Sequence, residues 1–96
     1  MPADGVRQRV IVHGRVQGVC FRSATEAEAL AAGVAGFVRN RADGSVEAVF
    51  EGDPEAVAAL VEFCRRGPRP AHVARIEAYE EPPEGLRGFR VLRSER

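Results

Sequence analysis

Lysine is absent from this chain, and arginine supplies its entire basic complement. The P-loop of nucleotide-binding proteins is therefore excluded, because that loop ends in Gly-Lys-Ser/Thr. An excess of positive charge is also absent, since Lys+Arg and Asp+Glu both number 14. A non-specific nucleic-acid binder needs a basic excess, so we expect no nucleic-acid partner.

Long apolar runs are missing as well. No segment approaches the length of a membrane span, and residues 1–8 lack the apolar core of a signal peptide. Only two cysteines occur, far apart and without the spacing of a metal site. We interpret Cys20 and Cys64 as free thiols in a reducing compartment. We therefore expect a cytoplasmic protein with no membrane association, no metal and no cofactor.

The 96 residues predict a single domain over residues 1–96, and the order of its elements indicates an α+β fold. Alternating apolar residues, helix formers and turn signals define that order. Strands are expected at residues 9–14, 35–41, 46–51, 73–80 and 89–92, and helices at 21–32 and 54–66. This pattern predicts a ferredoxin-like βαββαβ sandwich with a short extra C-terminal strand. Its two helices would cover one face of an antiparallel sheet.

Local signals support the element boundaries. Asp43-Gly44 predicts a hairpin turn between the second and third strands. Asp53 is expected to cap the second helix, with Pro54 at its first helical position. The apolar stripe of the second helix consists of Val57, Leu60, Val61 and Cys64.

In the first helix, periodicity leaves two buried stripes open: Ala27, Leu30 and Ala31, or Thr25, Ala29 and Ala32. The inward side of the strand at 73–80 is expected to include Val73 or Ala74, Ile76 and Ala78.

Residues 14–22, Gly-Arg-Val-Gln-Gly-Val-Cys-Phe-Arg, join the first strand to the first helix. A helix start offers unpaired N–H groups and the positive end of the peptide dipoles. Glycines allow backbone conformations in which several N–H groups point at one anion. The Arg22 guanidinium can donate hydrogen bonds to two phosphate oxygens at once. The spacing fits neither the dinucleotide Gly-x-Gly-x-x-Gly fingerprint nor a loop of cysteine, five residues and arginine. The loop therefore predicts a phosphate cradle without a covalent nucleophile.

Together with segments further along, this loop resembles the acylphosphatase family. The matching residues are 14–19, 21–22, 36–40, 43–47, 67–68, 71, 73 and 88–89, within a match over about residues 9–92. Phe37 stands where tryptophan is common in the family. The resemblance implies a ferredoxin-like fold and the metal-independent hydrolysis of acyl phosphates, which are carboxyl-phosphate anhydrides, to carboxylate and inorganic phosphate. It also favours the stripe with Ala29 in the first helix.

The resemblance implies that Arg22 and Asn40 are the catalytic residues. The backbone N–H groups expected to bind the phosphate are those of Gln17, Gly18, Val19, Cys20, Phe21 and Arg22. We expect Arg22 and these groups to hold the phosphoryl oxygens, and the Asn40 amide to orient a water for in-line attack.

A different class of function stays open, namely a ferredoxin-like module that binds an anion or metabolite without turnover. An RNA-binding sheet is disfavoured, because residues 46–51 carry one aromatic and two carboxylates. We expect a monomer whose partners are a small-molecule acyl phosphate and inorganic phosphate.

Overall fold

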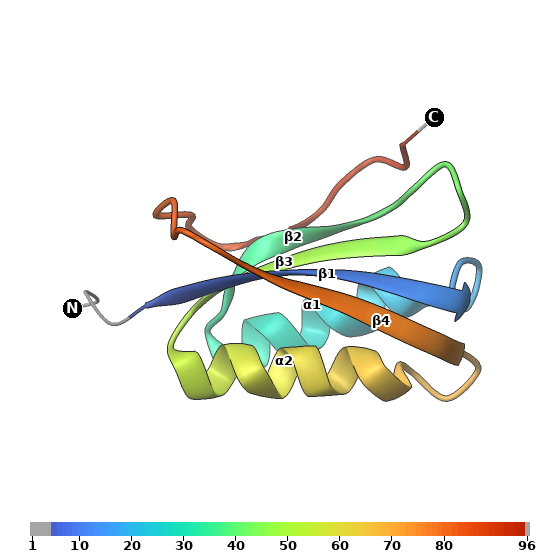
Figure 1. Cartoon of the computed structure of the whole chain (residues 1–96), viewed down its shortest axis with the longest axis horizontal. Coiled ribbons are helices and arrows are strands. Elements are labelled where there is room, and N and C mark those ends of the chain that lie inside the picture. The colour runs from blue at the N-terminus through green and yellow to red at the C-terminus, as the bar shows by residue number, and fades with distance from the viewer. Residues whose placement is uncertain (1–4, 96) are drawn as a thin grey trace.

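A five-stranded sheet is covered on one face by two helices in the computed structural model, which describes residues 5–95 (Figure 1). In chain order the elements are β1 (Val6–Arg15), α1 (Phe21–Ala32), β2 (Ala35–Asn40), β3 (Val46–Gly52), α2 (Pro54–Arg66), β4 (His72–Glu81) and β5 (Phe89–Val91). The strands lie side by side in the order β4-β1-β3-β2-β5. The predicted ferredoxin-like α+β fold is confirmed.

The sheet is mixed, whereas the sequence predicted an antiparallel one. β1 pairs antiparallel with β3 and β4, and β2 pairs antiparallel with β3. β5 instead runs parallel to β2. The chain leaves β4 at one edge of the sheet and reaches β5 at the other, and a parallel pair needs such a crossover connection rather than a tight turn. This crossing brings β5 beside the strand that ends at Asn40.

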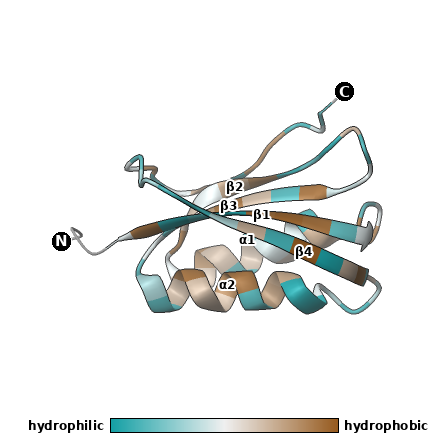
Figure 2. Ribbon diagram, viewed as in Figure 1, coloured by the Kyte–Doolittle hydropathy of each residue, from teal (hydrophilic) through white to brown (hydrophobic). Residues whose placement is uncertain are grey.

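The core lies between the sheet and the helices. Inward-facing side chains of β1 and β3 alternate with outward-facing ones, and Val10, Val12 and Phe50 are completely buried. The rings of Phe50 and Phe89 stack with their centroids 5.8 Å apart, which anchors β5 to the core. Figure 2 shows hydrophobic and hydrophilic segments alternating along the strands.

The buried row of α1 differs in part from the predicted stripe. Phe21, Thr25 and Ala29 are buried, whereas Ala32 is exposed and Leu30 is 59% exposed. The large ring of Phe21 in the first turn sets a row with a spacing of four residues, and Ala32 lies off that row. Alanine, which packs on either side of a helix, gave no sign of this in the sequence.

α2 begins and ends where its sequence predicts. The Asp53 carboxylate accepts hydrogen bonds from the N–H groups of Glu55 and Ala56, both at 3.1 Å, and Pro54 occupies the first turn. Gly67 ends the helix. Its buried residues are Val57, Leu60, Phe63 and Cys64, while the predicted Val61 is half-buried. Burial raises the pKa of the Cys64 thiol to about 12, and both cysteines are free.

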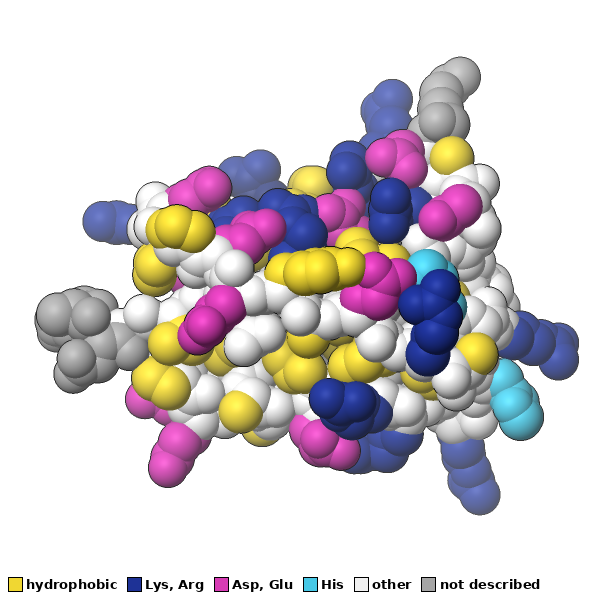
Figure 3. All heavy atoms as spheres, viewed as in Figure 1, with side chains coloured by type: hydrophobic (Ala, Val, Ile, Leu, Met, Phe, Trp, Pro, Cys, Tyr) yellow, Lys and Arg dark blue, Asp and Glu magenta, His cyan; other side chains and the backbone are white. Residues whose placement is uncertain are grey.

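Ion pairs cover much of the sheet face opposite the helices. Arg9 contacts both Glu81 and Glu47, and Arg7 donates to Glu81 at 2.8 Å. Hydrogen bonds from Arg9 and Arg7 lower the pKa of Glu81 to about 2. Figure 3 shows basic and acidic side chains interspersed on the side of the molecule away from the helices.

At the outer edge of this sheet, the twist carries the later part of β4 away from α2, so the predicted inward residue Ala78 is exposed (Figure 1).

Candidate active site

The loop between β1 and α1 starts at a β-bulge. The pairing of β1 with β4 shifts register between His13 and Gly14. Gly14 has φ 128°, and a Cβ there would lie 2.2 Å from the carbonyl oxygen of His72. Only glycine allows β4 to approach this closely, so Gly14 lets β1 stay paired while it turns into the loop.

Two residues of the loop have left-handed backbone conformations, Gly18 with φ 74° and Cys20 with φ 64°, and they turn the chain sharply. Cys20 is also the residue before α1, but its side chain makes no capping hydrogen bond, and the first turn of α1 has no acidic residue. Within residues 5–95, no group accepts a hydrogen bond from the backbone N–H groups of residues 17–22. A row of unpaired N–H groups at a helix start is a favourable site for an anion.

The buried side chain of Phe21 anchors the loop to the core. This ring is buried and packs against the Phe63 ring of α2, with the centroids 6.2 Å apart. The Thr25 hydroxyl donates to the Phe21 carbonyl oxygen at 2.8 Å, and a Cβ at Gly67 would come within 2.7 Å of the Phe21 ring. The side chain of Val19 also belongs to the core. Tight packing of these side chains holds the backbone of the loop in one conformation.

The side chain of Gln17 connects the loop to the turn between β2 and β3. Its Nε2 donates to the carbonyl oxygens of Arg41 at 2.8 Å and Ser45 at 2.9 Å. Asn40, the last residue of β2, accepts a backbone hydrogen bond from the N–H of Glu95 at 2.8 Å. The loop and the end of β2 are thus held in a fixed relative position, although they come from distant parts of the sequence.

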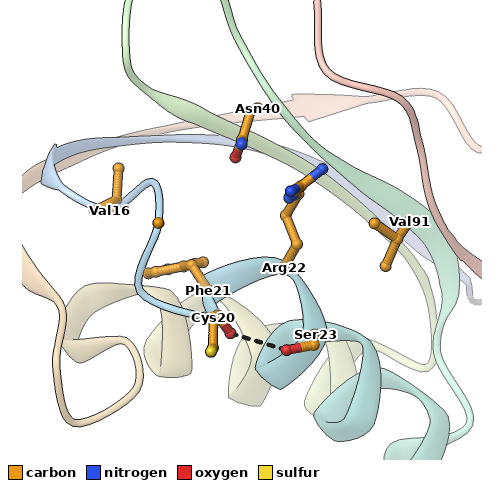
Figure 4. A pocket seen from close by; sticks show the side chains of 8 residues that line it. Val16, Cys20, Phe21, Arg22, Ser23, Asn40 and Val91 are labelled. Carbon is orange, nitrogen blue, oxygen red and sulfur yellow. Dashed lines mark hydrogen bonds between the residues drawn. The ribbon is translucent and has the colours of Figure 1, made fainter.

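Arg22 and Asn40 point toward one another across a pocket, Arg22 from the first turn of α1 and Asn40 from the end of β2 (Figure 4). The pocket has a volume of about 450 Å³. Its lining residues are Val16, Gly18, Cys20, Phe21, Arg22, Ser23, Asn40 and Val91. Neither the Arg22 guanidinium nor the Asn40 amide has a hydrogen-bond or ion-pair partner in the described part of the chain.

The structure therefore brings together five of the seven predicted site residues: Gly18, Cys20, Phe21, Arg22 and Asn40. Gln17 and Val19 do not line the pocket, and their backbone N–H groups lie in the same loop.

Sequence reasoning missed three lining residues, Val16, Ser23 and Val91. Ser23 donates to the carbonyl oxygen of Cys20 at 3.3 Å, a local contact typical of a helix start. Val91 comes from β5, and only the crossover to the edge beside β2 places it here. In the sequence, the alternation of a strand from Phe89 onward is the signal that would place Val91 on the same face as Phe89.

Residues 5–95 contain no cluster of three or more His, Cys, Asp or Glu side chains that could hold a metal ion. In the same part of the chain, no helix has the length and apolar character needed to cross a membrane.

Known proteins match this chain over nearly its full length. The family model described as acylphosphatase matches residues 8–91. An acylphosphatase of Gloeobacter violaceus is 55% identical over 92 residues, covering 96% of this chain and 99% of the relative. An acylphosphatase of Synechococcus sp. is 55% identical and covers 93% and 95%.

A solved structure supports the same assignment. The crystal structure of acylphosphatase from Bacillus subtilis has a TM-score of 0.87 and 39% identity, covering 91% of this chain and 98% of that one. A family model over most of the chain, relatives above half identity and a shared fold all indicate one family. This chain therefore belongs to the acylphosphatase family.

Proposed function

We propose that the pocket between the loop, Arg22 and Asn40 binds the phosphoryl group of an acyl phosphate and hydrolyses it. The activity class follows from membership of the family. The observation that carries the assignment of the site is the geometry: an unpaired helix start, a guanidinium and an amide face the same pocket (Figure 4).

The loop and Arg22 hold the phosphoryl oxygens. The N–H groups of residues 17–22 present partial positive charge at the N-terminal end of α1. The Arg22 guanidinium adds a full charge and a planar pair of donors. These donors are positioned before substrate binds. The hydrogen bonds that they make to the phosphoryl oxygens become stronger as negative charge spreads over those oxygens in the transition state.

Asn40 orients the attacking water. Its carboxamide has both a donor and an acceptor, and it lies across the pocket from Arg22. The water oxygen forms a bond to phosphorus while the bond from phosphorus to the acyl oxygen breaks. The carboxylate leaves with that electron pair and needs no proton near neutral pH. The proton of the water passes to a phosphate oxygen, which yields inorganic phosphate.

Hydrolysis needs no metal, because the loop N–H groups and Arg22 supply the positive charge. We further propose that residues 1–96 form one domain with its core over about residues 9–92, in a cytoplasmic monomer with no nucleic-acid partner. The two free thiols and the balanced charge support the location and the lack of a nucleic-acid partner.

Hydrolysis of benzoyl phosphate in the presence of a chelator tests the function. Arg22→Ala and Asn40→Ala should each lower kcat/KM at least ~100-fold, as loss of a transition-state donor does elsewhere. Arg69→Ala is the matched control, because Arg69 is an exposed arginine that does not line the pocket. Circular dichroism checks that each variant is folded.

The outcomes separate the two classes of function. Turnover in the wild type and in Arg69→Ala, with loss in the other two variants, supports the enzyme and both roles. Phosphate binding without turnover in the folded wild type would support an anion-binding module instead. Full activity in folded Asn40→Ala would remove the water-orienting role from Asn40.

A further inference from the structure

The pocket has room for the acyl group of the substrate beside the phosphate cradle. The phosphoryl group accounts for the loop N–H groups, Arg22 and Asn40, but a pocket of about 450 Å³ is large enough for a small organic ligand. Of the remaining lining residues, Val16 is buried and the Ser23 hydroxyl already donates to Cys20. Val91 is the lining residue without an assigned partner or role.

β5 holds Val91 at the mouth of the pocket. Val91 lies opposite Val38 in the parallel pair, and the N–H of Leu92 donates to the Val38 carbonyl oxygen at 2.9 Å. Side chains in such register share a face of the sheet, and Val38, Asn40 and Val91 therefore all face the helix side. Figure 4 shows Val91 on the opposite side of Arg22 from Val16.

Val91 is also unusually exposed for its type. Its exposed fraction is 39%, and in residues 5–95 only Leu30 and Tyr79 are other large hydrophobic residues with exposed side chains. Neither of those two lines this pocket. An aliphatic side chain that is left in water beside a polar anion site gains free energy when an apolar ligand group covers it.

We propose that Val91 forms the apolar wall of an acyl subsite, so that this residue sets a preference for acyl phosphates with a larger apolar acyl group over acetyl phosphate. This inference rests on the proposed function, because it requires the phosphoryl group to lie against the loop. With the phosphoryl oxygens on the loop and Arg22, and the water beside Asn40, the carbonyl carbon must extend out of the cradle. Among the described residues that line the pocket, Val91 is the one large hydrophobic side chain that is exposed to receive it.

Kinetics with two substrates test the subsite. Val91→Ala should lower kcat/KM for benzoyl phosphate about tenfold, in the range found when methyl groups are lost from an apolar pocket, and that for acetyl phosphate less than about twofold. The inhibition constant of inorganic phosphate should stay unchanged. Val91→Thr keeps the shape and removes apolar character, so it should show the same selective loss. Leu30→Ala is the matched control, an exposed aliphatic side chain outside the pocket.

Binding of non-hydrolysable analogues separates failure of the subsite from failure of the proposed function. Calorimetry would compare benzoylphosphonate with acetylphosphonate. If the wild type binds the benzoyl analogue more tightly and Val91→Ala and Val91→Thr lose that preference, the subsite holds, even where no turnover is seen. If the wild type hydrolyses both substrates and the Val91 variants lower neither benzoyl rate nor benzoyl affinity selectively, the subsite is overturned while the function stands.

Discussion

The two helices begin in opposite ways. α2 starts at Asp53, whose carboxylate accepts from two backbone N–H groups, and Glu55 adds a negative charge in the first turn. α1 starts at the left-handed Cys20, with neither a side-chain cap nor an acidic residue. The start of α2 satisfies its own donors, whereas the start of α1 leaves its donors without an acceptor among residues 5–95, beside Arg22.

This difference shows how a small fold divides stability from function. A capped start contributes about 1 kcal/mol to stability, so the open start of α1 forgoes that contribution. The packing of Phe21 on Phe63 and the hydrogen bonds of Gln17 hold the open loop in place instead. Four substitutions would test this division, and Cys20→Asp should have a larger effect than Gln17→Leu, Asp53→Ala or Cys20→Gly.

Cys20→Asp should have the largest effect, because it gives α1 the negative charge that α2 has. Two unit charges 4 Å apart near a protein surface repel by about 4 kcal/mol. The new carboxylate would oppose the substrate phosphate and occupy its donors, so kcat/KM for benzoyl phosphate should fall more than ~100-fold. Near-normal activity in this variant would show that the start of α1 does not bind the phosphate.

Gln17→Leu should disturb the loop through its connection to the β2–β3 turn. It removes two hydrogen bonds, each contributing about 1 kcal/mol, so the free energy of unfolding should fall by about 2 kcal/mol. We expect kcat to fall more than KM rises, because Asn40 and the loop lose their fixed relative position. Urea unfolding and steady-state kinetics measure the two effects, and an unchanged kcat would contradict the positioning role.

Asp53→Ala should affect stability alone. Loss of an N-cap aspartate costs about 1 kcal/mol, and α2 contributes no residue to the pocket lining. The urea midpoint should therefore fall while kcat/KM for benzoyl phosphate stays at the wild-type value. A marked loss of activity under native conditions would mean that the two helix starts are coupled.

Cys20→Gly should have the smallest effect. A left-handed conformation costs a residue with a Cβ about 1–2 kcal/mol, and glycine loses about 0.5–1 kcal/mol more backbone entropy on folding. The net expectation is a gain of about 0.5 kcal/mol in the free energy of unfolding, with activity retained. This variant is also the control for Cys20→Asp, since it tests the loss of the thiol without added charge.

The sequence predicted best those features that local chemistry determines. Asp53-Pro54 and Asp43-Gly44 each specify a conformation within a few residues, and both are found where expected. The buried row of α1 was wrong at Ala32, because alanine carries too little apolar area to mark a face. The parallel pairing of β5 was missed because strand direction depends on a crossover, which no local pattern records.

In the candidate site, too, the features that depend on contacts between distant parts of the chain could not be predicted from local patterns. The sequence placed Arg22 and Asn40 in one site only through the resemblance to a family, since they come from separate elements. The hydrogen bonds from Gln17 to carbonyl oxygens 24 and 28 residues away in the sequence were not predicted. No periodicity specifies a side-chain contact between residues so far apart in the sequence. The position of Val91 depends on the whole sheet order.

The absence of lysine has a consequence for the chemical survival of the protein. An acyl phosphate is an activated acylating agent, and a neutral amine beside it forms an amide. The cation in this pocket is Arg22, and a guanidinium ion has no free electron pair to attack a carbonyl carbon. A lysine side chain can lose its proton when it is desolvated, whereas Arg22 can hold a reactive mixed anhydride through many turnovers without becoming acylated itself.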